Sequence, residues 1–169
     1  MNAEDFPTPQ TEVDSVTPEK LKQRIDNGDD LTILDARMAW EYAEWHIDGP
    51  SIEPINVPYF HFLEEDLDTD VIADVPDDRE VTVICAKGGA SEFVAGTLAE
   101  RGYDVHHIED GMNGWARIYE AVEVTDYDGA GTLLQYQRPS SGCLGYLVYD
   151  DGEAAVIDPL RTFTGRYLD

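Results

Sequence analysis

The sequence predicts an α/β fold: a parallel sheet flanked by helices, followed by a short C-terminal antiparallel β segment. Short apolar runs alternate with helical segments as far as Tyr119, a pattern typical of parallel sheets. After Tyr119 three apolar runs follow one another with no helical segment between them. The class therefore switches there from βα units to antiparallel strands.

The first predicted elements are a short strand and a helix. Residues 1–14 are polar and acidic, and we expect them to form a flexible leader. Val16 begins a strand. Thr17-Pro18-Glu19 then marks a helix start, because threonine is a good N-cap and proline suits the first helical position. Asn27-Gly28 ends this helix, since glycine is favoured just beyond a helical C-terminus.

The alternation continues through the middle of the chain. Strands are predicted at 31–34, 55–57, 81–84 and 105–108, and helices at 38–46, 59–66, 91–101 and 112–119. Residues 81–84 are the clearest strand, because every residue there is β-branched. Parallel sheets bind ligands beyond the carboxyl ends of their strands. Cys85 follows directly on strand 81–84 and therefore falls at the expected functional edge.

The last part of the chain is predicted to be a separate β segment. Residues 15–122 are interpreted as the first domain, 123–132 as a linker and 133–169 as the second, incomplete domain. Asp150-Asp151-Gly152-Glu153 is a strong hairpin signal. The predicted strands on this segment are 133–137, 143–149 and 154–157.

The charge balance restricts the partners. The chain carries 36 acidic and 11 basic residues, a formal net charge of −25, and therefore repels phosphate backbones and anionic lipids. We expect neither nucleic-acid nor membrane binding. The acids are spread along the whole chain, which favours a halophile surface whose self-repulsion is screened by salt. No apolar stretch is long enough to span a membrane and the N-terminus lacks a secretory signal, so the expected location is cytoplasmic.

Cys85 is the candidate nucleophile. It opens a loop, Cys85-Ala86-Lys87-Gly88-Gly89-Ala90-Ser91, between a strand end and a helix start. Backbone N–H groups of such a loop can curl around one point and favour an anion, and the helix dipole adds partial positive charge. A thiol held there should be a better nucleophile. The alternative is that Cys85 is a small buried residue at a strand end.

Lys87 and the pair of Asp35 and Arg37 each allow two interpretations. Lys87 could attract an anionic donor or stabilise the thiolate. Asp35 and Arg37 could be catalytic or could form a structural ion pair. His46 is expected to end a helix with its ring hydrogen-bonded, and Cys143 to be inert in an apolar strand.

Several segments together resemble the rhodanese (sulfurtransferase) family. The first match is Leu34-Asp35-Ala36-Arg37, with Glu41-Tyr42 and His46-Ile47-Asp48-Gly49 after it. Ile55-Asn56-Val57-Pro58 and the Cys85 loop follow in the family's order. Gly102-Tyr103-Asp104-Val105 and Glu109-Asp110-Gly111-Met112-Asn113-Gly114-Trp115 resemble the closing signature. The resemblance covers about 105 residues.

The resemblance implies a sulfurtransferase. Cys85 would take a sulfane sulfur from a small donor, become a persulfide, and pass the sulfur to a thiol or another nucleophile. The backbone N–H groups of Ala86, Lys87, Gly88, Gly89, Ala90 and Ser91 would surround the outer sulfur. No cofactor is implied. A second hypothesis is a non-catalytic sulfur carrier or partner-recruiting module.

Two positions, Ala90 and Trp45, depart from the family's usual pattern. Members that use thiosulfate often have an arginine where this chain has Ala90, so a planar, bidentate anion binder is missing and thiosulfate should be a poor donor. A low-molecular-weight or protein persulfide is the more plausible donor. A phosphatase branch of the fold needs an arginine six residues after the cysteine; Ser91 stands there, which argues against phosphatase activity. Trp45, where a small residue is common, is expected to change packing only.

The C-terminal segment resembles the opening hairpin of the metallo-β-lactamase fold. Ser140–Val148 and Ala155–Pro159 carry this match, and that family is often fused to rhodanese domains, for example in persulfide dioxygenases. Its metal-binding motif, His-x-His-x-Asp-His, is absent from the sequence, whose four histidines all precede residue 108. We therefore expect no metal site and no hydrolase activity here, and interpret the segment as truncated or as docking on a metallo-β-lactamase-fold partner.

Overall fold

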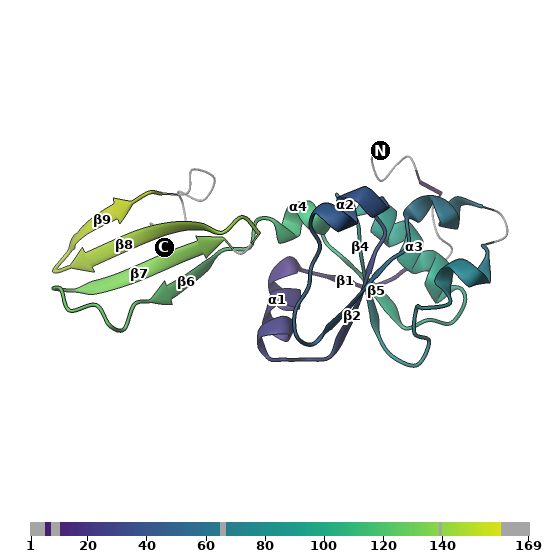
Figure 1. Cartoon of the computed structure of the whole chain (residues 1–169), viewed down its shortest axis with the longest axis horizontal. Coiled ribbons are helices and arrows are strands. Elements are labelled where there is room, and N and C mark those ends of the chain that lie inside the picture. The colour runs from purple at the N-terminus through teal and green to yellow at the C-terminus, as the bar shows by residue number, and fades with distance from the viewer. Residues whose placement is uncertain (1–5, 8–10, 65–66, 139, 160–169) are drawn as a thin grey trace. The chain divides into compact units, whose positions relative to one another are not determined.

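The computed structural model describes residues 6–7, 11–64, 67–138 and 140–159 of the 169-residue chain. Contacts divide the chain into two compact units, Met1–Trp115 and Ala116–Asp169 (Figure 1). The first unit contains a parallel sheet flanked by helices and the second an antiparallel sheet, which confirms the predicted fold class.

The sheet of the first unit has five parallel strands in the order β1-β5-β4-β2-β3. Their bounds are β1 Ser15–Val16, β2 Leu31–Asp35, β3 Ile52–Asn56, β4 Val81–Ile84 and β5 Val105–Ile108. β2 and β4 are buried along their whole length, as expected for central strands of a sheet covered on both faces. β4 lies between β2 and β5, so the residue after it, Cys85, emerges near the middle of the sheet's carboxyl edge.

Helical segments connect these strands: α1 Pro18–Asp26, α2 Ala39–Glu44, α3 Gly89–Ala99 and α4 Gly111–Trp115, with 3₁₀ turns η2 Tyr59–Leu63 and η3 Thr69–Ile72. α1 begins as predicted, because the Thr17 side chain accepts a hydrogen bond from the Lys20 N–H and Pro18 occupies the first turn. α1 and α3 lie on opposite sides of the sheet (Figure 1).

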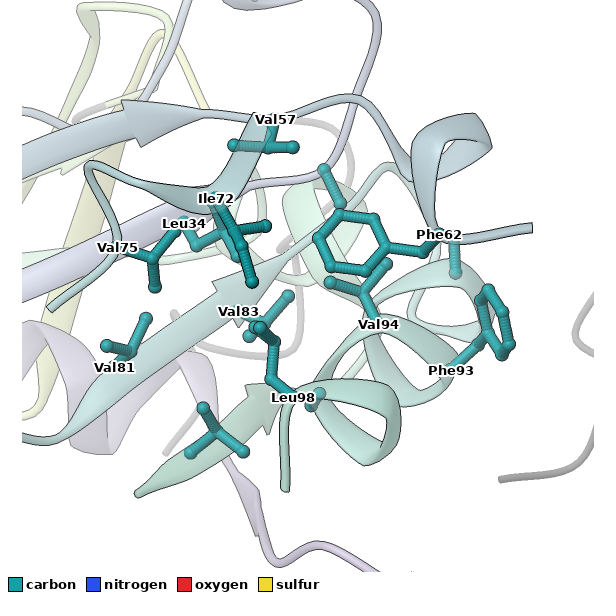
Figure 2. Packing of buried hydrophobic residues seen from close by; sticks show 14 of the residues in the cluster. Leu34, Val57, Phe62, Ile72, Val75, Val81, Val83, Phe93, Val94 and Leu98 are labelled. Atoms are coloured by element: carbon teal, nitrogen blue, oxygen red, sulfur yellow. The ribbon is translucent and has the colours of Figure 1, made fainter. Parts of the chain in front are cut away.

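One hydrophobic cluster joins α3 to the sheet. Leu34, Val81 and Val83 from the strands meet Val94 and Leu98 from α3, and Phe62 and Ile72 come from the two 3₁₀ turns (Figure 2). These side chains are at most 4% exposed. Burying such side chains contributes roughly 1.5–3 kcal/mol each, so this cluster holds the start of α3 firmly against the end of β4.

The second unit is a four-stranded antiparallel sheet in the order β6-β7-β8-β9. The strands are β6 Glu120–Glu123, β7 Thr132–Arg138, β8 Cys143–Asp150 and β9 Glu153–Ile157. The predicted hairpin is confirmed: β8 pairs with β9, and Asp151 and Gly152 both have positive φ (42° and 82°), the conformation of a tight two-residue turn.

Several boundaries differ from those predicted from the sequence; α3, for example, covers Gly89–Ala99 and not 91–101, and η2 ends at Leu63 and not at residue 66. α4 ends at Trp115 and not at Tyr119, and residues Glu120–Glu123 form β6, which pairs with β7. The two units consequently divide between Trp115 and Ala116, whereas the sequence placed the end of the first domain at 122. β3 also begins earlier than residue 55 and includes Pro54, which is tolerated because β3 is an edge strand.

The predicted leader lies partly outside the described residues. Its described members include Phe6 and Val13, which are partly buried against the hydrophobic cluster of the first unit. The carbonyl of Asp14 accepts a hydrogen bond from the His107 N–H. These residues therefore pack on the first unit instead of being solvated throughout.

Candidate functional site

The thiol of Cys85 is enclosed by its own loop. Cys85 is 4% exposed. The Gly88 N–H donates a hydrogen bond to Cys85 Sγ at 3.0 Å, and the Sγ lies 3.3 Å from Ser91 Oγ, to which the thiol donates. Ser91 in turn donates to the Gly88 carbonyl oxygen at 2.8 Å. Gly88 and Ser91 thus hold the sulfur atom directly from the helical side of the loop.

The turn at Gly88 makes this arrangement possible. Gly88 has φ of +99°, which L side chains rarely adopt, and it precedes the first residue of α3. A Cβ at Gly88 would lie 3.3 Å from the Asp110 backbone nitrogen. Glycine at position 88 therefore has a conformational cause. Gly89 instead forms the first turn of α3.

A second segment holds the loop from outside. The Met112 N–H donates to the Cys85 carbonyl at 2.7 Å, and the Asn113 N–H donates to the Ala86 carbonyl at 3.1 Å. A Cβ at Gly111 would lie 2.2 Å from the Cys85 carbonyl oxygen, so only glycine fits there. Sequence reasoning missed this role of residues 111–113. The Asp-Gly pair at 110–111, with φ of 56° and 54°, was the available signal.

A pocket of about 180 Å³ opens beside Cys85. Its lining is mostly apolar, and it comes from the Cys85 loop and from segments far away in sequence. From the loop, the lining residues are Cys85, Ala86, Lys87, Gly89 and Ala90; from elsewhere they are Phe6, Ala36, Arg37, Glu41 and Tyr59. The predicted loop residues are thus divided, because Gly88 and Ser91 bond the sulfur and the others face the pocket.

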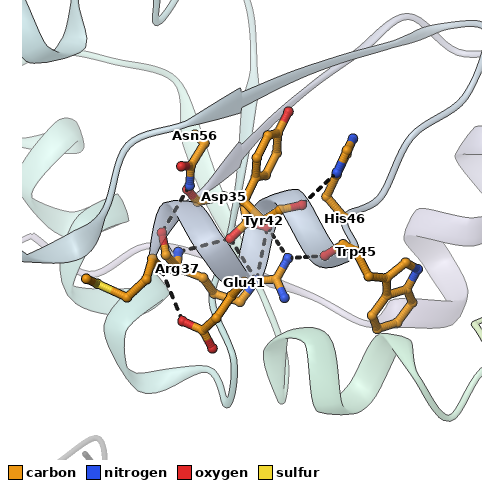
Figure 3. Close-up of polar contacts among 8 residues, drawn as sticks. Asp35, Arg37, Glu41, Tyr42, Trp45, His46 and Asn56 are labelled. Atoms are coloured by element: carbon orange, nitrogen blue, oxygen red, sulfur yellow. Dashed lines mark hydrogen bonds and ion pairs between the residues drawn. The ribbon is translucent and has the colours of Figure 1, made fainter.

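Asp35 and Arg37 form a buried ion pair at the end of β2. Arg37 Nη2 lies 2.6 Å from Asp35 Oδ2, and Arg37 Nε lies 3.0 Å from each carboxylate oxygen. Arg37 Nη2 also donates to the Trp45 carbonyl at 2.6 Å (Figure 3). These contacts favour the structural interpretation of the pair. Arg37 still borders the pocket, but much of its hydrogen-bonding capacity is already engaged.

Helix α2 carries Glu41 and Tyr42 of the first signature, and His46 follows just after its end. Glu41 accepts a hydrogen bond from the Met38 N–H at 3.1 Å, which caps the helix (Figure 3). The His46 ring bonds the Tyr42 carbonyl at 2.9 Å, as expected for a satisfied histidine. Burial raises the pKa of the Tyr42 phenol, and the carboxylates of Asp35 and Asp48 raise it further. Tyr42 is therefore a neutral side chain at physiological pH.

The pocket has few charged groups with which to hold an inorganic dianion. Lys87 is exposed, Arg37 is paired with Asp35, and Glu41 adds a negative charge. Ala90, where an arginine would supply a bidentate anion contact, is buried and lines the pocket.

Two other residues lie outside this pocket. His106 on β5 is buried and bonds Thr82 Oγ1 at 2.7 Å, and burial lowers its pKa below the ordinary 6.5. Cys143, which the sequence placed in an apolar strand, begins β8 and is exposed.

Within the described ranges, no three metal-ligating side chains gather at one point. No helix among the described residues is long and apolar enough to cross a bilayer.

Comparison with known proteins connects this geometry with a family. The family model "Rhodanese-like domain" matches residues 17–118. A Bacillus subtilis protein named "Putative sulfur carrier protein YrkF" is 27% identical over 104 residues, which cover 61% of this chain and 51% of that protein. An Allochromatium vinosum protein named "Sulfurtransferase" is 26% identical over 106 residues, 62% of this chain and 90% of its own length.

A solved structure supports the fold. The crystal structure of a rhodanese-like domain protein from Staphylococcus aureus matches 61% of this chain and 91% of its own, with 25% sequence identity and a TM-score of 0.50. The aligned region of the Bacillus carrier is only about half of that protein.

Proposed function

The chain belongs to the rhodanese-like domain family, and on that premise we propose that it is a sulfurtransferase whose Cys85 carries sulfane sulfur as a persulfide. The observation that carries the proposal is the position of the Cys85 sulfur. It lies at the carboxyl edge of the central strand β4, against the start of α3, and accepts a hydrogen bond from the Gly88 N–H. Developing negative charge on sulfur is stabilised in such a place.

The proposed reaction has two displacement steps. In the first, the Cys85 thiolate attacks the outer sulfur of a persulfide, R–S–SH. The S–S bond of the donor breaks, the R–SH thiol leaves, and Cys85 holds the terminal sulfur as Cys–S–S⁻. In the second, an acceptor thiolate or cyanide attacks that terminal sulfur, and the Cys85 thiolate is regenerated. Neither step needs an external oxidant or a cofactor.

The loop residues have complementary roles in this proposal. Residues 86–91 would surround the added sulfur through their backbone N–H groups, with Ser91 able to donate its hydroxyl hydrogen to the sulfur once the thiol is ionised. Asp35 and Arg37 would act as supports, because they fix the turn after β2 that forms one side of the pocket. An organic persulfide is the proposed donor, because the lining is mostly apolar and Ala90 offers no anion contact.

A second candidate is a sulfur carrier that is loaded by one partner and emptied by another. The similarity to a carrier-named protein favours it, as does a small pocket in which Arg37 is already paired. The second unit, with its resemblance to the start of a metallo-β-lactamase fold, would then recruit a partner of that fold. For either candidate function we propose a cytoplasmic location in a halophile, and the net charge of −25 supports the halophile origin.

Intact-mass measurement tests the proposal. The protein in high salt is incubated with thiosulfate and, separately, with glutathione persulfide. The Cys143→Ser variant serves as parent, because Cys143 is exposed and could add sulfur without any site. We expect the parent to gain one sulfur atom and the Cys85→Ser/Cys143→Ser variant to gain none. Cyanide should then remove that sulfur as thiocyanate.

The outcomes separate the candidates. Repeated turnover with a small acceptor supports a sulfurtransferase, whereas a single loading that only a protein acceptor discharges supports a carrier. An unmodified parent, with its fold verified by circular dichroism, contradicts both.

A further inference from the structure

Phe6 reaches the Cys85 pocket from the far N-terminal part of the chain. It is one of the residues that line the pocket, together with Tyr59 and Ala90. The other residues that line the pocket among those described come from the segment between β2 and α3, whereas Phe6 lies before β1. The wall that it forms is therefore added to a site that β2, β4 and their following loops already build.

Two aromatic rings hold Phe6 in this position. The Tyr59 ring meets it edge-on, with centroids 5.4 Å apart and an interplanar angle of 83°. The Phe93 ring stacks with it at 5.9 Å and 26°. Both are favourable aromatic geometries.

The partners of Phe6 are themselves tied to the site. Phe93 is buried on α3, the helix that starts from the Cys85 loop. The Tyr59 N–H donates to the Ala36 carbonyl, and the Ala36 N–H donates to the Ile84 carbonyl, one residue before Cys85. Phe6 is thus positioned by backbone that also positions the thiol.

We propose that Phe6 is a specificity residue that selects, by size and apolar character, the groups that reach the Cys85 thiol. Its ring narrows the pocket and offers an apolar surface beside a mostly apolar lining. Compact apolar groups attached to sulfur fit against this wall, and larger ones collide with it. As a statement about sulfur donors and acceptors, the inference rests on the proposed function; as a statement about access to the thiol, it does not.

Two maleimides of different size test the inference without any sulfur transfer. Addition forms a bond between Cys85 Sγ and an alkene carbon of the maleimide, while the thiol proton passes to the neighbouring carbon. N-methylmaleimide is the small probe and N-(1-pyrenyl)maleimide the large one. Their second-order rates are measured in the Cys143→Ser parent, in which Cys85 is the sole thiol. The readout is the ratio of the large-probe rate to the small-probe rate.

Phe6→Ala should raise this ratio about fivefold, because the large probe no longer collides with the ring; a fivefold change in rate corresponds to a barrier lower by about 1 kcal/mol. Phe6→Leu keeps an apolar wall, so its ratio of probe rates should stay near that of the parent. Phe60→Ala is the matched control, because Phe60 also contacts Tyr59 but is 41% exposed and does not line the pocket. Circular dichroism verifies the fold of each variant.

Two results would overturn the inference. One is an unchanged ratio in Phe6→Ala, even if both probe rates rise, and the other is an equal increase of the ratio in Phe60→Ala. Failure of sulfur loading with a raised ratio would instead count against the proposed function alone.

Discussion

The Gly88 N–H donates a hydrogen bond to the Cys85 sulfur across 3.0 Å, and Gly88 can do so because its φ is +99°. This contact connects a property of the backbone with the chemistry of the site. The residue that turns the chain into α3 is also the one that holds the sulfur, so a change at Gly88 should affect stability and reactivity together.

Gly88→Ala should lower both the stability of the chain and the reactivity of Cys85. A Cβ at this φ costs about 1–2 kcal/mol of stability, and relief of the strain would move the N–H away from Cys85 Sγ. Gly28→Ala is the control, since Gly28 has φ of +76°, a Cβ there would meet nothing within 4 Å, and it lies far from Cys85 in sequence. Thermal unfolding should show a similar loss in both variants, while the rate of sulfur loading should fall in Gly88→Ala alone. Equal loading rates would contradict the assigned role of the hydrogen bond.

Ala90→Arg should improve the use of thiosulfate. The guanidinium would project from a residue that lines the pocket and supply charge-assisted hydrogen bonds to the donor's sulfonate. Such bonds contribute about 1.5–3 kcal/mol, so thiosulfate loading should rise about tenfold or more relative to glutathione persulfide. Ala90→Met controls for the added bulk, because it has a long side chain without the charge. The same donor preference in both variants would refute the charge argument.

The Asp35–Arg37 pair should show strong coupling in a double-mutant cycle. Arg37→Met leaves the Asp35 carboxylate buried without its partner, which costs about 3–5 kcal/mol, and Asp35→Asn should be comparably damaging. The double variant should lose much less than the sum. Arg79→Met removes an exposed ion pair with Glu53 and should change stability by about 1 kcal/mol or less. Urea unfolding measures all four variants, and additive losses would show that the pair is not coupled.

Stability should fall as the pH drops below about 6.5, because of His106. Burial lowers its pKa in the folded chain; Arg24 and His107 act in the same direction, and Glu80 and Asp104 oppose them. The unfolded chain, with the ordinary pKa of 6.5, binds more protons between the two values, so acid favours unfolding. The contribution is complete above pH 6.5 and is lost as the pH falls through the lowered pKa. Thermal unfolding from pH 8 to pH 5 should show a smaller decline in His106→Gln; identical declines would exclude His106 as the cause.

Salt should stabilise the chain. With a net charge of −25, self-repulsion favours expansion, and raising the ionic strength from 0.1 M to 1 M shortens the screening length from about 10 Å to about 3 Å. Each 1 kcal/mol gained should raise Tm by about 2–4 °C for a chain of this length. Sodium and potassium chloride should act alike, and most of the gain should come below about 1 M. A Tm that does not rise with either salt would contradict this account.

The order and type of most elements could be predicted from local sequence patterns. β-branched runs such as 81–84, the Thr17-Pro18 helix start and the Asp151-Gly152 turn are local signals, and local sterics and hydrogen bonds decide their conformation. The sequence also made Cys85 the candidate nucleophile, because a cysteine between a strand and a glycine-containing helix start is a local pattern. The predicted loop residues lie where that pattern places them, around the thiol or along the pocket.

The features that could not be predicted depend on contacts between residues distant in the chain. Glu120–Glu123 become a strand only because β7 offers backbone partners, and no residue pattern in 120–123 requires it. Gly111 must be glycine because the Cys85 carbonyl lies against it, a contact between residues 26 positions apart (111 − 85). Phe6 belongs to the pocket because the Tyr59 ring meets it edge-on and the Phe93 ring stacks against it. Such contacts arise from packing between elements, and the hydrophobic pattern of a single segment carries no record of its distant neighbours.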